Sequence, residues 1–174
     1  SLIIQPLAPT NQSKMQTCYY GDKALPPLYT AVSDDDLERV ISILESDADP
    51  QLEFRGRKLD FTCLWDHTAL GCAVSSFCNA EIIEKLLEHG ADFTDAIRKV
   101  MEVGSSDLSI ELRESPLQYV LAKKEWALNG PAEGGGFEGF TEYCIETYGR
   151  APTRDWFDDV VELLVSKENE LMIR

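Results

Sequence analysis

The sequence is poor in the residues on which metal sites and nucleic-acid-binding surfaces depend. It has two histidines, five cysteines without a CxxC pair, and 16 lysines and arginines against 31 acidic residues. Isolated cysteines lack the paired spacing of a zinc site or a disulfide framework, so we expect reduced thiols, no metal and an intracellular protein, cytoplasmic or nuclear. A net charge of −15 opposes binding to a nucleic-acid backbone, which needs clustered cations, but permits attraction to a basic partner.

Long apolar runs are also missing. No stretch approaches the roughly 18 residues of a membrane span, and residues 1–10 have no basic region of the kind that opens a signal peptide. At 174 residues, of which 44% are hydrophobic, the chain has the size of one domain with a proper core. We therefore expect one folded domain that does not bind membranes, either a monomer or part of a larger chain.

Helical periodicity is clearest in residues 80–93. Ala80, Ile83, Leu86 and Leu87 fall on one side of a helix, with acidic residues and Lys85 on the other. The dipeptide His89-Gly90 follows, and glycine readily adopts the left-handed conformation in which helices often end. The pattern predicts an amphipathic helix that ends at this dipeptide.

Both this stripe and a shorter one before it occur three times. The longer stripe returns as Leu37, Val40, Ile43 and Leu44 and as Phe157, Val160, Leu163 and Leu164. The shorter, at i, i+3 and i+4, is formed by Leu28, Ala31 and Val32, by Leu70, Ala73 and Val74, and by Leu117, Val120 and Leu121. The recurrence predicts three pairs of helices that bury their apolar sides against each other.

The segments "HTALGCAV" at 67–74 and "LLEHGAD" at 86–92 resemble the T-P-L-H-x-A opening and the G-A-D turn of ankyrin repeats. The resemblance implies an all-α ankyrin-repeat solenoid of stacked helix pairs joined by finger loops or short hairpins. It also implies a non-enzymatic module without cofactors that binds a partner protein. The chain departs from the family at Gly71, where the family has histidine.

The repeats divide the chain into an extended arm, 1–24, and a repeat domain, 25–174. Repeats are expected at about 26–50, 67–93 and 115–170, the last with an insertion at 123–153 that includes a short helix near 139–149. In the arm, Leu2, Ile3 and Ile4 are candidates to cover the first repeat. Between the second and third repeats, the spacing of Ala96, Ile97, Val100 and Met101 predicts a short extra helix followed by an extended return.

The segment 51–66 stands where the family has its first finger, and it is longer than usual. Family resemblance places partner proteins in the concave groove between the fingers and the first helices. On this chain the groove would involve Arg55, Arg57, Lys58, Phe61, Trp65 and Asp66 of the finger region, with Tyr29, Thr30, Gly71 and Gln118 at its base. Trp and Arg are frequent binding hot spots, so Trp65 and Arg57 come first; the alternative is that the finger aromatics only pack the loop down.

Two other functions compete with this one. An acidic inhibitor, in the manner of an immunity protein, would block a basic enzyme through charge. A small enzyme would have a cleft formed by the insertion, with Glu142, Tyr143 or Glu146 as its titratable groups. The aromatic residues of the insertion, Phe137, Phe140, Tyr143 and Tyr148, are expected to pack on the repeats rather than form a binding patch.

Two remaining motifs have structural explanations. Gly134, Gly136 and Gly139 spell GxGxxG, but no buried strand precedes them and neighbouring glutamates would repel phosphate, so we interpret the motif as a loop. The acidic clusters 34–36 and 158–159 precede or open second helices, where carboxylates interact favourably with the positive helix end. Neither motif indicates a catalytic site.

Overall fold

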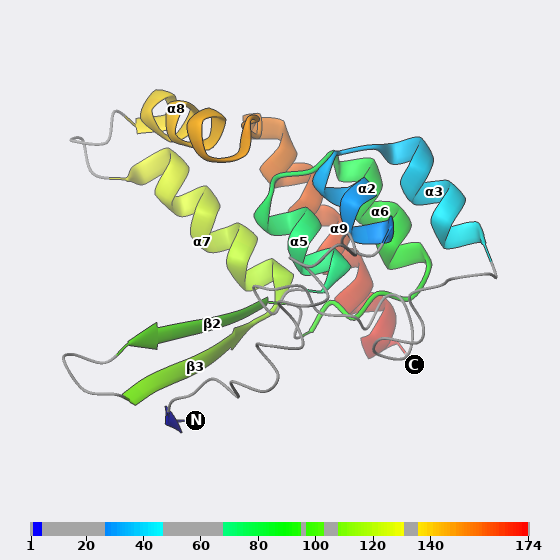
Figure 1. Ribbon diagram of the computed structural model, residues 1–174, viewed down its shortest axis with the longest axis horizontal. Helices are drawn as coiled ribbons and strands as arrows, with labels where there is room; N and C mark the ends of the chain where they lie inside the picture. Colours follow the sequence, from blue (N-terminus) through cyan, green and yellow to red (C-terminus); the bar gives the residue numbers. More distant parts are fainter. Residues whose placement is uncertain are drawn as a thin grey trace, which may run out of the picture.

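The computed structural model describes residues 2–4, 27–46, 68–94, 97–102, 108–130 and 136–173. Most of these residues are helical, as the sequence predicts, and a small antiparallel sheet lies at one end of the helical part (Figure 1). The helices are α2 (Pro27–Ser33), α3 (Leu37–Glu45), α5 (Ala69–Ser75), α6 (Ala80–Glu88), α7 (Pro116–Asn129), α8 (Gly136–Tyr148) and α9 (Arg154–Met172).

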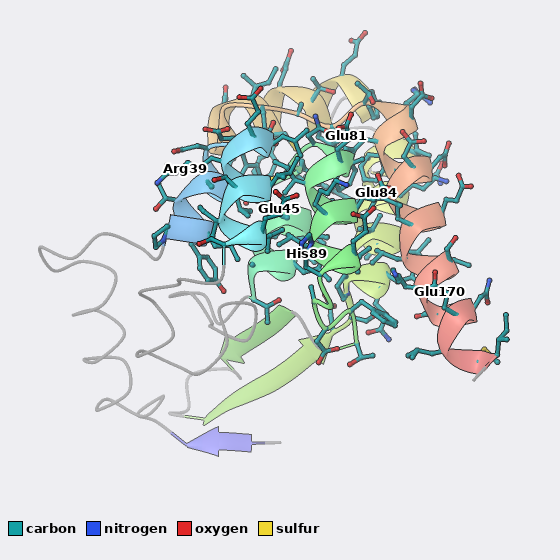
Figure 2. All side chains as sticks on the ribbon, turned by 90° about the vertical axis from the view of Figure 1, so that its right-hand side faces the viewer. Arg39, Glu45, Glu81, Glu84, His89 and Glu170 are labelled. Carbon is teal, nitrogen blue, oxygen red and sulfur yellow. The ribbon has the colours of Figure 1, made fainter. Side chains whose placement is uncertain are left out.

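Six of these helices form two layers. α2 packs against α5 and α5 against α7, while α3 packs against α6 and α6 against α9. The layers are joined within pairs, because α2 contacts α3, α5 contacts α6 and α7 contacts α9. Figure 2 shows the second layer from outside, with α3, α6 and α9 side by side. The predicted pairing of helices is therefore present in all three places.

Side-chain caps explain where five of the helices begin. Each residue before the first helical turn accepts a hydrogen bond from a backbone N–H that has no partner inside the helix. The capping residues are Asp36 for α3, Thr68 for α5, Asn79 for α6, Ser115 for α7 and Thr153 for α9. At the other end of α6, Gly90 has a φ of 86°, so the left-handed ending predicted from the sequence is confirmed.

The core lies between the two layers and contains most of the predicted stripes. Leu28, Ala31, Val32, Leu70, Ala73, Val74, Ile83, Leu86, Phe157, Val160 and Leu164 are all buried. One stripe residue departs from the prediction, since the side chain of Leu121 on α7 is 47% exposed. Its stripe belongs to the third pair, in which α7 contacts α5, α8 and α9, and the described residues contain no fourth helix pair to stack on it.

The sheet contains β1 (Leu2–Ile4), β2 (Ile97–Glu102) and β3 (Leu108–Glu114) in the order β1-β3-β2. Both neighbouring pairs are antiparallel; Leu2 pairs with Ile110, and Ile97 pairs with Glu114. β1 thus joins the strands that precede the third helix pair, whereas the sequence suggested that this segment covers the first.

The extra helix expected from Ala96 to Met101 is wrong, because Ile97–Glu102 is strand β2. In a strand, Ile97 and Met101 share one face because they are four positions apart, so the same sequence is also compatible with a strand. The whole length of β2 pairs with residues 109–114 of β3, which supplies backbone hydrogen bonds that a helix of fewer than two turns lacks. The expected extended return is confirmed as β3.

The insertion differs from expectation at its start, because α7 continues without a break to Asn129. α8 contains the predicted short helix and extends it at its N-terminal end, and it packs against α7. The acidic pair Asp158-Asp159 does not open a helix, since α9 already begins at Arg154. Asp158 instead forms an ion pair with Lys124 of α7, with Nζ and Oδ1 2.7 Å apart.

Candidate partner-binding surfaces

The predicted groove residues divide into two groups. The finger-region residues lie outside the described part of the chain; they are Arg55, Arg57, Lys58, Phe61, Trp65 and Asp66. The base residues lie on α2, α5 and α7, which neighbour each other in one layer. The structure therefore places the four predicted base residues on neighbouring helices. The contribution of the finger region stays a prediction.

Within the base, accessibility separates the four residues. Tyr29 is 1% exposed and belongs to the core, and Gly71 is also buried, so neither presents a side chain to a partner in this structure. Thr30 is half-buried and Gln118 is exposed. Gln118 already has a structural role, because its Oε1 accepts a hydrogen bond from the Ser115 N–H at 3.0 Å in a capping box.

The exposed side of α3, α6 and α9 is strongly acidic. These helices carry two, three and six carboxylates respectively, against one, one and two cationic side chains. We call this side the acidic outer face; its members include Glu45, Glu81, Glu84, Glu88 and Glu170, all exposed, four of which are labelled in Figure 2. Such a face attracts basic molecules over distances of about 10 Å at moderate salt.

Charges on this face interact across helices. A hydrogen bond from Lys85 Nζ, 2.9 Å from Glu88 Oε2, lowers the pKa of the Glu88 carboxyl, and Lys167 of α9 contributes in the same direction. The same hydrogen bond raises the pKa of Lys85, with smaller contributions from Glu84 and from Glu45 of α3. The three helices therefore form one electrostatic surface, although its exposed ion pairs add little to stability.

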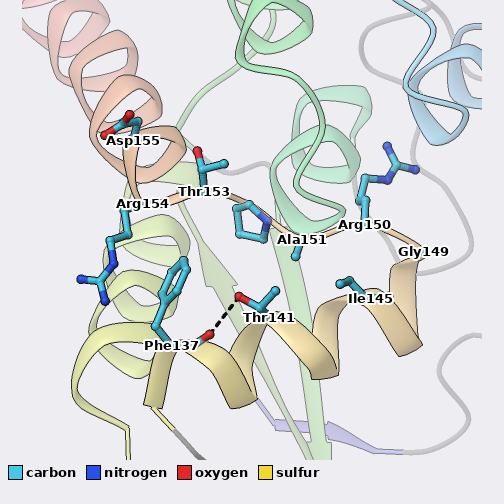
Figure 3. A pocket seen from close by; sticks show the side chains of 10 residues that line it. Phe137, Thr141, Ile145, Gly149, Arg150, Ala151, Thr153, Arg154 and Asp155 are labelled. Atoms are coloured by element: carbon cyan, nitrogen blue, oxygen red, sulfur yellow. Dashed lines mark hydrogen bonds between the residues drawn. The ribbon is translucent and has the colours of Figure 1, made fainter.

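An open pocket of about 750 Å³ lies between α8 and the segment that leads into α9 (Figure 3). Phe137, Thr141 and Ile145 line it along α8. Two of its polar groups are engaged locally: the Thr141 hydroxyl donates to the Phe137 carbonyl at 2.9 Å, and the Arg154 guanidinium lies 4.7 Å from the centre of the Phe137 ring. These features suit an apolar contact rather than acid–base chemistry.

The enzyme hypothesis placed its titratable groups in the insertion, but none of Glu142, Tyr143 and Glu146 lines this pocket. The expected packing of the insertion's aromatic residues is confirmed for Phe140, which is buried, while Tyr143 is exposed. Phe140 contacts Phe77, at the turn between α5 and α6, with ring centres 5.8 Å apart.

Sequence reasoning missed a polar network that joins the three helix pairs. Arg150, before α9, donates to the Ser33 carbonyl and to Cys78 Sγ, and its Nη1 lies 3.7 Å from Asp35 Oδ1. The Trp156 indole N–H donates to the Cys78 carbonyl at 2.6 Å. Only the positive φ of Asp35, 57°, could have left a sequence signal, because aspartate tolerates that conformation better than most residues.

Within the described ranges, no helix is long and apolar enough to cross a membrane, and no group of His, Cys, Asp or Glu side chains is placed to hold a metal ion. Comparisons with protein-family models, with curated proteins and with solved structures found no match to this chain.

Proposed function

We propose that this chain is an ankyrin-type repeat solenoid that binds a partner protein and catalyses no reaction. The observation that supports it best is the order of helix contacts, in which first helices neighbour first helices and second helices neighbour second helices. A repeated helix pair that stacks on its neighbours produces this order. The caps at Thr68 and Ser115 and the left-handed Gly90 fit the same repeat pattern.

The hairpin of β2 and β3 supports the location of the binding surface. It lies between α6 and α7 in the chain, where the family has a finger. Residues 51–66 lie between α3 and α5 in the chain, the position that corresponds to the family's first finger. The proposed partner contacts this finger, with Trp65 and Arg57 as anchors, and also the half-buried Thr30 and the exposed Gln118 of the adjoining layer.

Affinity capture from a lysate of the source cell tests this proposal. The bait is the intact chain, compared with Trp65→Ala and Arg57→Ala, at low and high salt. Tyr143→Ala is the matched control, because it removes an exposed aromatic ring from a different surface. We expect a partner that survives high salt, is lost with Trp65→Ala and is retained by Tyr143→Ala. Unchanged capture by both Trp65→Ala and Arg57→Ala would contradict the finger site.

The acidic outer face favours a second candidate, an inhibitor of a basic enzyme. Its partner would be captured at low salt and released at high salt, because exposed charges are screened. Reversing Glu45 and Glu84 to lysine should abolish this capture, whereas Glu142→Lys, on α8, changes the net charge equally per site and should weaken it less. A partner that depends on Trp65 but not on Glu45 and Glu84 excludes this candidate.

A further inference from the structure

Equivalent positions in the three first helices differ in exposure. Val32 on α2 and Val74 on α5 are 0% exposed, whereas Leu121 on α7, at the same position of the stripe, is 47% exposed. α2 and α5 are each followed in their layer by another helix. Leu121 is therefore an apolar residue at a position that packs against the next helix in the other two pairs. On α7 the described residues place no next first helix against it.

Other apolar side chains extend this exposed side along both helices of the third pair. On α7, Leu117 and Leu128 lie four residues before and seven after Leu121, which puts all three on one side of the helix. On α9, Val161, Val165 and Met172 have the same spacing; Val165 is 37% and Met172 85% exposed. Leu117 and Val161 are half-buried against the core.

An ion pair shows that the two stripes are adjacent. Lys124 lies within the α7 stripe, Asp158 lies three residues before Val161 on the same side of α9, and their side chains are 2.7 Å apart. We call the combined surface the end face; it consists of Leu117, Leu121, Leu128, Val161, Val165 and Met172, with this ion pair between the stripes. Exposed apolar residues that gather on adjacent sides of two helices mark an interaction site more often than scattered apolar residues do.

The charges on the end face distinguish between two occupants. Glu125, Asp158 and Glu168 are exposed on or beside the stripes. Two described cations lie on the same sides of the helices: Lys124, which Asp158 neutralises, and Arg154, whose guanidinium lies over the Phe137 ring of α8. A second copy would bring the same carboxylates and a further net charge of −15. A helix with an apolar stripe and basic flanks complements both the stripe and its acidic border.

We propose that the end face binds an amphipathic helix of a partner protein, with Lys or Arg residues flanking its apolar stripe. The helix would pack on α7 and α9 as α7 itself packs on α5. This surface shares none of the residues assigned to the first finger, so it is a second interaction site. A result that excludes the finger site would not exclude the end-face site, and the reverse is also true.

Two synthetic peptides of about 18 residues, five turns of helix, serve as probes. Both carry leucines at i, i+3, i+4 and i+7, and they differ only in having lysines or glutamates beside the stripe. Binding to the intact chain is measured by fluorescence anisotropy at moderate salt. We expect the lysine peptide to bind about tenfold or more tighter than the glutamate peptide. Equal affinity of the two would overturn the basic character of the partner.

Leu121→Glu locates the site, because it removes apolar contact while adding a negative charge that by itself attracts the lysine peptide. We expect its affinity for that peptide to fall about tenfold. Ile145→Glu is the matched control, since Ile145 is 53% exposed but lies on α8, and it should leave binding within about twofold. Equal affinities of the two variants would overturn the end-face site.

Val165→Glu provides an independent variant on α9, and circular dichroism of every variant establishes that it is folded. Analytical ultracentrifugation of the chain alone tests whether a second copy of the chain binds the end face instead. A dimer that forms at micromolar concentration and is abolished by Leu121→Glu would assign the end face to a second copy and overturn the proposal. A monomer that binds the lysine peptide through Leu121 and Val165 supports it.

Discussion

The guanidinium of Arg150 lies 3.7 Å from the carboxylate of Asp35, although the first residue precedes α9 and the second follows α2. The same carboxylate accepts the Asn79 N–H at 2.7 Å, at the start of α6. Arg150 also donates to the Ser33 carbonyl and contacts the Cys78 thiol. Arg150 thus connects all three helix pairs. The other contacts between pairs are mainly those between a pair and the next one in the stack.

Arg150→Ala should lower the free energy of unfolding by about 1 to 3 kcal/mol, because it removes charge-assisted hydrogen bonds from a half-buried position. Urea unfolding followed by circular dichroism measures the change. Arg39→Ala is the control, since its ion pair with Asp34, 3.8 Å long, is exposed and should contribute less than about 1 kcal/mol. Equal effects of the two variants would show that the Arg150 network does not stabilise the stack.

Phe77→Ala should be among the most destabilising single changes, at about 3 to 5 kcal/mol. The ring is buried and makes edge-to-face contacts with Phe140, Tyr148 and Trp156, at centre distances of 5.8, 5.6 and 5.3 Å. Thermal unfolding measures the loss. Tyr143→Ala, which removes an exposed ring, should cost much less. A small effect of Phe77→Ala would mean that α8 is not held against the α5–α6 turn.

Burial raises the pKa of the Cys78 thiol to about 12, against an ordinary value of 9. The folded state therefore retains a proton that the unfolded state loses, so this contribution to stability is complete below about pH 9. It decreases between pH 9 and 12 by up to about 1.4 kcal/mol per pH unit. Urea unfolding at pH 8 and pH 10 measures it. Cys78→Ala should show a shallower decrease, and parallel decreases would contradict the raised pKa.

Gly90→Ala should destabilise the protein by about 1 kcal/mol, because glycine adopts its φ of 86° without the strain that a Cβ introduces. A Cβ placed there has no atom within 4 Å, so the cost is conformational and not a clash. Gly90→Asn, which tolerates the left-handed region, should recover part of the loss. Comparable unfolding midpoints for the alanine variant and the unchanged chain would contradict this explanation.

Periodicity predicted the helices well where the apolar stripe was long. The stripe from Leu37 to Leu44 and that from Ala80 to Leu87 each extend over two turns, and both became helices of the expected phase. Between residues 96 and 101, four apolar residues were too few to distinguish a helix from a strand. Pairing with β3, whose residues are more distant in sequence, decided the conformation.

The candidate surfaces were less predictable because exposure depends on neighbours. Nothing in the stripe of Leu117, Val120 and Leu121 distinguishes it from the two stripes before it, yet only the third has an exposed member. Likewise, Tyr29 occupies a position assigned to the groove base but is part of the core. The Arg150 network joins residues from three separate segments, which no local pattern reveals.

The pairing of β1 with β3 has a consequence for synthesis on the ribosome. Leu2, Ile3 and Ile4 leave the ribosome before the other described residues, but their partners Ile110, Ser109 and Leu108 follow only after the residues of the first two helix pairs. The nascent strand must therefore wait unpaired while α2, α3, α5 and α6 are already able to associate. A bulky tag fused before residue 2 would lie next to this edge strand and could hinder its pairing with β3. We therefore expect a tag after residue 174 to interfere less with this pairing.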